Sequence, residues 1–192
     1  MKKQIISAGI VAALVVYFSM TLVVFPQEFA SKTPIEPQPI HSISLTDEQI
    51  KLGQSFHIAI QIENQNDVSD ILITSVAFPK LEQIKDNVEI ISYDYTQSPR
   101  YIKAEDKLMS EYTLGGLVLA QYPSIEAYSR NVPPDTSYQM ELKVTPNDPG
   151  SFEIYIKTIA IPHTTDLSHY PYDGLLDSQG EFVSVYTVQV NP

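Results

Sequence analysis

The sequence predicts an all-β domain, an antiparallel β-sandwich preceded by a single transmembrane helix. Three observations lead to this prediction. A long uncharged apolar run lies near the N-terminus, polar and apolar residues alternate with a period of two through much of the remainder, and turn-forming residues divide that remainder into short segments. At 192 residues the chain has room for one domain of ordinary size and an appendage.

The predicted anchor runs from Ile5 to Phe25 without a charge, and a helix of this length spans the hydrocarbon core of a bilayer, roughly 30 Å thick. Lys2 and Lys3 precede it and all 23 acidic residues follow it, so the positive-inside rule places the N-terminus in the cytoplasm and the C-terminal domain outside the cell membrane. The alternative is a cleaved signal peptide, whose apolar run is shorter, about 7 to 15 residues. The nearest candidate cleavage site lies after Ala30, and there Glu28 occupies a position that prefers a small side chain. We therefore expect residues 1–25 to remain as a cytoplasmic tip and uncleaved anchor.

Residues 26–39 contain four prolines, a spacing that favours an extended stalk, and the extracytoplasmic domain is expected over 40–192. The chain has no cysteine, so disulfides and thiolate metal sites are excluded. It also has no glycosylation sequon, which favours a bacterial or archaeal envelope. Beyond the apolar run ten basic residues face 23 acidic ones, a balance that opposes binding to nucleic acid.

Alternation is clearest from Ser55 to Glu63, where one face carries only large apolar residues: Phe56, Ile58, Ile60 and Ile62. The same pattern predicts strands from Tyr138 to Val144 and from Phe152 to Ile156. Weaker strands are expected at 43–45, from Ile71, from Val88, near Val118 to Gln121, from Ile125 and from Phe182, and a short crossover helix is expected from Lys103 to Tyr112. Eight or nine short strands separated by turns predict an immunoglobulin-like sandwich of two sheets.

The run from Lys51 to Asn64 with its following polar turn, and the Pro133-Pro134-Asp135 and Pro149-Gly150 turns that lead into later strands, resemble the immunoglobulin-like repeats of prokaryotic surface proteins. That group includes the bacterial cell-adhesion-related domains and similar archaeal S-layer-associated modules. The resemblance covers roughly residues 43–161 and implies adhesion, spacing or scaffold roles. The segments 96–116 and 162–181 are longer than in such compact repeats.

Two loops carry residue types that bind metals. In the first, His163 and His169 flank Asp166, a set that suits Zn or Cu. In the second, oxygen-bearing side chains that could hold Ca²⁺ cluster after a strand: Asn64, Asn66, Asp67 and Asp70. The alternatives are a solvated surface loop in the first case and a tight turn held by local hydrogen bonds in the second. We expect these alternatives to hold, with neither a metal nor another cofactor.

No catalytic signature accompanies these loops. A G-x-S-x-G nucleophile motif is absent, and Gly115-Gly116 has no lysine placed to hold phosphate. We therefore expect a protein that is not an enzyme.

The 18 residues from His163 to Gly180 form the predicted partner-binding segment, because hairpin connections usually have about 2 to 5 residues. Its candidate contact residues are Tyr170, Tyr172, Leu175 and Leu176. The alternative is that they cover an open edge of the sandwich.

The sequence thus predicts a membrane-anchored binding or structural module of the cell envelope that acts through protein–protein contacts. The alternative is a single-pass accessory subunit of a larger membrane complex, whose anchor packs closely through small residues: Ser7, Ala8, Gly9, Ala12 and Ala13. An extracytoplasmic metal-binding protein or hydrolase is the least favoured reading.

Overall fold

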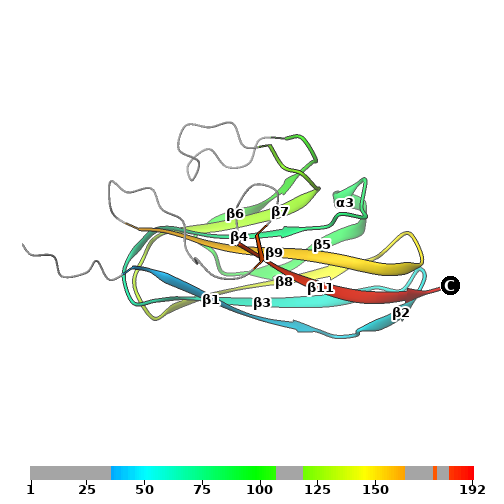
Figure 1. Cartoon of the computed structure of the whole chain (residues 1–192), viewed down its shortest axis with the longest axis horizontal. Coiled ribbons are helices and arrows are strands. Elements are labelled where there is room, and N and C mark those ends of the chain that lie inside the picture. Colours follow the sequence, from blue (N-terminus) through cyan, green and yellow to red (C-terminus); the bar gives the residue numbers. More distant parts are fainter. Residues whose placement is uncertain (1–35, 107–118, 163–174, 177–181) are drawn as a thin grey trace, which may run out of the picture. The chain divides into compact units, whose positions relative to one another are not determined.

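The structure, a computed structural model, describes residues 36–106, 119–162, 175–176 and 182–192. The predicted anchor from Ile5 to Phe25 lies outside these residues. Within the described ranges no helix is long and apolar enough to span a membrane. What they form is a sandwich of two β-sheets (Figure 1).

The smaller sheet has four strands, in the spatial order β1 (Gln38–Leu45), β3 (Phe56–Gln65), β8 (Thr136–Val144) and β5 (Val88–Tyr93). The larger sheet has the order β10 (Leu175–Leu176), β11 (Phe182–Asn191), β9 (Gly150–Pro162), β4 (Ser69–Ala77), β7 (Ser124–Val132) and β6 (Gln97–Ile102). One more strand, β2 (Gln49–Lys51), pairs with β11 in parallel, and a four-residue helix, α3 (Ile84–Asn87), precedes β5.

The strand order identifies the sandwich as immunoglobulin-like. Neighbours β1, β3 and β8 occupy the places of strands A, B and E, and neighbours β11, β9 and β4 those of G, F and C. The strand β5, next to β8, occupies the place of strand D, and the chain departs from that scheme only at β6 and β7, which follow β5 and extend the larger sheet beyond β4. The predicted all-β, immunoglobulin-like sandwich is therefore confirmed for the described domain.

Alternating side chains from both sheets fill the core. Phe56, Ile58, Ile60 and Ile62 of β3 are at most 1% exposed, as their alternation predicts. The rings of Phe56 and Phe152 meet edge to face, with their centroids 6.0 Å apart, and so join the two sheets.

The strand β4 is buried on both faces, which explains why its sequence does not alternate. Leu72 and Val76 belong to the main core between the sheets. Ile73 faces the other way and forms a second buried cluster with Ile159 and Ile161 of the neighbouring β9.

Other elements differ from the sequence-based expectation. The expected helix from Lys103 is wrong over its described part, because Asp106 N donates to Lys103 O in a turn and Glu105 has a φ of 67°. The expected strand near Val118 to Gln121 is reduced to an isolated bridge at Leu119. The short strands β2, β6 and β10 were not expected, and β1 begins at Gln38, within the proline-rich segment.

A histidine links the sheets at the side of the sandwich. His41 of β1 has Nε2 3.1 Å from Ser184 Oγ of β11 and Nδ1 3.1 Å from Thr158 Oγ1 of β9. Burial lowers the pKa of His41 below its ordinary value of 6.5.

The lowered pKa predicts a pH-dependent stability. Because the unfolded chain keeps a His41 pKa near 6.5, it binds more protons than the folded chain below that pH, and stability falls as the pH drops from about 7 toward 5. We expect His41→Gln to flatten this part of the profile, measured as urea midpoints at the two pH values. The control variant is His57→Gln, which changes a histidine on the outer face of the smaller sheet. It should retain the part of the pH dependence of stability that comes from His41. Equal pH slopes in the wild type and His41→Gln would contradict the assignment.

Candidate functional site

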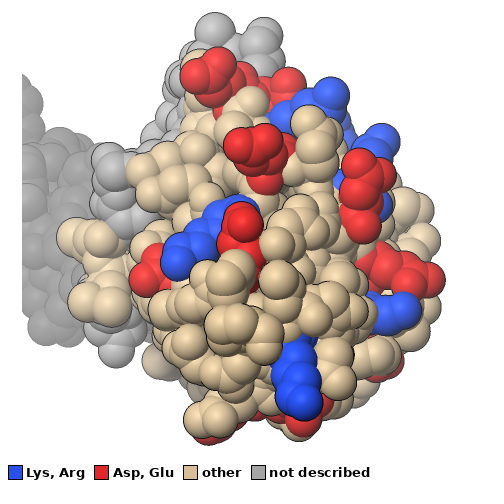
Figure 2. Space-filling view, turned by 90° about the vertical axis from the view of Figure 1, so that its right-hand side faces the viewer, with Lys and Arg blue, Asp and Glu red and all other residues tan. Residues whose placement is uncertain are grey.

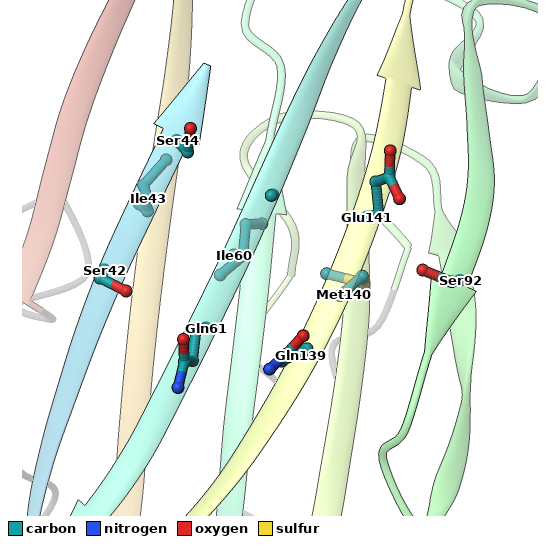
Figure 3. A pocket seen from close by; sticks show the side chains of 10 residues that line it. Ser42, Ile43, Ser44, Ile60, Gln61, Ser92, Gln139, Met140 and Glu141 are labelled. Carbon is teal, nitrogen blue, oxygen red and sulfur yellow. The ribbon is translucent and has the colours of Figure 1, made fainter. Parts of the chain in front are cut away.

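The outer face of the smaller sheet, which points away from the core, carries a hollow of about 350 Å³. Its polar lining comes from all four strands: Ser42, Ser44, Gln61, Ser92, Gln139 and Glu141. Figure 3 shows these side chains around the hollow, with β1, β3, β8 and β5 side by side beneath them.

Strand register explains the shape of the hollow. One row of directly opposed residues runs Ser42, Gln61, Gln139 across three strands. In the next row Ala59 lies between Ser44 and Glu141. Because Ala59 and the serines are short while the two glutamines and Glu141 are long, the face is hollowed where the short residues meet.

A hydrogen-bonded pair of side chains, His57 and Glu141, borders the hollow. His57 Nδ1 of β3 lies 2.8 Å from Glu141 Oε1 of β8, and both side chains are 39% exposed. His57 alternates with the buried Phe56 and Ile58 along β3, so its side chain lies on the polar outer face of the strand. Glu141 is the one charged residue among those that line the hollow.

The first candidate metal residue, Asn64, lies inside the domain and is fully buried. Its side-chain amide Nδ2 donates toward the backbone oxygens of Asp67 at 2.8 Å, Val132 at 3.0 Å and Pro133 at 3.3 Å. Its own backbone oxygen accepts from Asp135 N at 2.6 Å. Asn64 therefore ties the β3–β4 turn to the β7–β8 turn.

The next two residues of this loop, Asn66 and Asp67, make hydrogen bonds within the domain. Asn66 has a φ of 71°, and its amide donates to Gln38 Oε1 at 3.1 Å. Asp67 Oδ1 accepts from Val68 N at 2.7 Å, while Asp70 lies further on, within β4. A local hydrogen bond thus engages Asp67, and a hydrogen bond to the neighbouring strand β1 engages Asn66. Across the described ranges no group of three or more His, Asp or Glu side chains is placed to hold a metal ion.

The second candidate loop, with His163, Asp166 and His169, lies outside the described residues, as do Tyr170 and Tyr172 of the predicted contact segment. Leu175 and Leu176 are described. They form the edge strand β10, opposite Val183 and Phe182 of β11.

The exposed apolar side chains of β10 stand out. Leu175 is 66% exposed and Leu176 is 60%, the two highest values among the large hydrophobic residues that the structure describes. On the neighbouring strand Val185 is 42% exposed. It lies two residues beyond Val183, the partner of Leu175, so Leu175 and Val185 share a face of the sheet.

Charge is dispersed at the end of the domain where β11 finishes. Figure 2 views this end and shows acidic and basic side chains interleaved, without a broad patch of one sign. The negative formal charge of the chain is therefore not gathered into a single acidic surface on this end.

No family model matches this sequence, and no curated protein matches it. Among solved structures, the chain is similar to the CARDB domain of a Pyrococcus furiosus protein in complex with di-metal ions, with 8% identity, a TM-score of 0.45, and coverage of 84% of this chain and 98% of that chain. It is also similar to AvmM, which catalyses macrocyclization in alchivemycin A biosynthesis, with 8% identity, a TM-score of 0.43, and coverage of 82% and 90%. A β-glucosidase from Listeria innocua matches at 11% identity and a TM-score of 0.38, over 81% of this chain and 16% of that enzyme.

These TM-scores all lie below 0.5, so the sandwich is assigned from its own strand order. Surface-layer association remains an expectation from the sequence.

Proposed function

We propose that the protein is a membrane-anchored, non-catalytic module of the cell envelope whose β-sandwich lies outside the cytoplasm and binds another envelope protein. The observation that carries this proposal is the exposed edge formed by β10, with Leu175 and Leu176. Apolar anchors with a polar surround are typical of protein interfaces. The anchor itself is supported by the uncharged run from Ile5 to Phe25.

The position of β10 in the chain supports a binding role for the predicted contact segment from His163 to Gly180. β10 follows Tyr170 and Tyr172 closely in the sequence, and tyrosine is enriched among the residues that dominate binding energy. An edge strand of two residues offers few backbone groups for sheet extension, so the apolar side chains supply the contact area.

The triple variant Tyr170→Ser, Tyr172→Ser, Leu175→Ser tests the proposal in the full-length chain. We expect it to lose the proteins that co-purify with the wild type from native membranes in mild detergent, while its melting temperature changes little. The matched control is Ile40→Ser, which removes a 44% exposed apolar side chain from the smaller sheet and should retain the partner.

Two results would contradict the proposal. One is binding of every co-purifying protein by the folded triple variant. The other is a fall of several degrees in its melting temperature, which would assign the segment to covering the sheet edge. A second experiment tests the competing role as an accessory subunit of a membrane complex, by exchanging residues 5–25 for an unrelated anchor helix. A partner that binds the anchor helix is then lost, whereas a partner that binds β10 is retained.

A further inference from the structure

We propose that the hollow on the smaller sheet binds an uncharged, polyhydroxylated ligand of the class of neutral polysaccharides. This goes beyond the proposed function, because the hollow and β10 belong to different sheets and use different residues. The module would then have two binding surfaces, an apolar edge for a protein and a polar face for glycan.

The first argument is the state of the hydrogen-bonding groups. Within the described part of the chain, the side chains of Ser42, Gln61 and Gln139 make no hydrogen bond, and the same holds for Ser44 and Ser92. Each hydroxyl and each amide can both donate and accept. Sugar hydroxyls have the same dual character, so the hollow offers them several matching partners that are not engaged by other described side chains or backbone groups.

The second argument is charge. Neither lysine nor arginine lines the hollow, and its one charged residue, Glu141, is paired with His57. An anionic ligand would meet a carboxylate with no guanidinium or ammonium group to bind it. Phosphate-bearing and uronic-acid ligands are therefore disfavoured relative to uncharged ones.

The third argument is shape. The hollow is a depression on an open sheet face, and the short side chain of Ala59 is part of its lining. Gln61 and Gln139 lie side by side on the neighbouring strands β3 and β8 (Figure 3). Small-molecule sites bury most of their ligand, which a depression of this kind does not do. A polymer that crosses the strands gains contacts along its length instead. The polar lining also lacks the aromatic or arginine anchors that dominate protein–protein interfaces.

The test uses the full-length chain in lipid nanodiscs, which avoids detergents with sugar head groups. Its migration is measured in native gels that contain dextran, glucomannan or galactan, with alginate as the anionic comparison. We expect at least one neutral polymer to retard the wild type, and Gln61→Ala/Gln139→Ala to weaken this binding about tenfold or more. The matched control Gln189→Ala removes an exposed glutamine from β11 and should bind as the wild type does.

A second variant keeps every hydrogen-bonding group. Ala59→Tyr fills the floor of the hollow from an exposed position, so it should abolish retardation without lowering the melting temperature. Failure of all three neutral polymers to retard the wild type, equal binding by the double glutamine variant, or preference for alginate would each overturn the proposal. The β10 triple variant should still bind glycan, so the failure of one surface is distinguishable from the failure of the other.

Discussion

Phe56→Ala is expected to destabilise the domain by about 3–5 kcal/mol, the usual cost of removing a buried aromatic ring. Phe56 is fully buried, and its ring packs edge to face on Phe152 of the opposite sheet. The variant therefore leaves a cavity where the two sheets meet. Urea denaturation should show a clearly lower midpoint, since this loss is a large share of the about 5–15 kcal/mol by which whole domains are stable.

The control for this change is Gln61→Ala on the same strand. Gln61 faces the outer hollow, so its loss should alter stability by less than about 0.5 kcal/mol. If the two variants had equal stability, the core position of Phe56 would be refuted.

Asn64→Asp is expected to be nearly as damaging, although the two side chains have the same shape. The amide Nδ2 of Asn64 donates to three backbone oxygens, and an oxygen in its place would face them as a fourth acceptor. Losing the donor leaves buried acceptors unsatisfied, at about 1–3 kcal/mol, and the buried carboxylate raises the total to about 3–5 kcal/mol.

The pH dependence of that variant separates charge from shape. Burial beside carbonyl oxygens raises the pKa of the introduced carboxyl group, so stability should be partly recovered as the pH falls toward 4. Asn66→Asp is the matched control, since Asn66 is exposed in the same turn and Asp tolerates its left-handed conformation. A pH-independent loss in Asn64→Asp, or an equal loss in both variants, would refute the role given to the amide.

The sequence predicts the core strands well, because one buried face imposes a period of two. This holds for β3, for β8 and for the first half of β9, where the alternating apolar residues of the predicted strands pack in the core. The prediction fails for strands that are buried on both faces and for strands that are very short. In β4 both faces are covered, so Ile73 and Leu72 are adjacent and buried alike. In β2 and β10, strands of three and two residues are too short to show a period.

The candidate sites were harder to predict, because they depend on strand order. Ser42 and Glu141 are almost a hundred residues apart in the chain and line one hollow only because β1, β3 and β8 are neighbours. The alternation in the sequence places Gln61 and Gln139 on the outer faces of their strands, but it does not show the register that aligns them. The composition of the loop that begins at Asn64 suggested either a cation site or a turn. The structure adds what composition cannot show, which is that the side-chain amide of Asn64 points at backbone oxygens and donates hydrogen bonds to them.

The parallel pairing of β2 with β11 bears on how the domain responds to mechanical load. β2 pairs through Gln49, Ile50 and Lys51 with the last residues of the C-terminal strand, and β1, where the described chain begins, pairs with β3 over its whole length. Tension between the N-terminal segment and the C-terminus pulls along these strands. Their hydrogen bonds are then loaded together in shear and not opened one after another, so we expect the domain to transmit force along its long direction with high resistance to rupture.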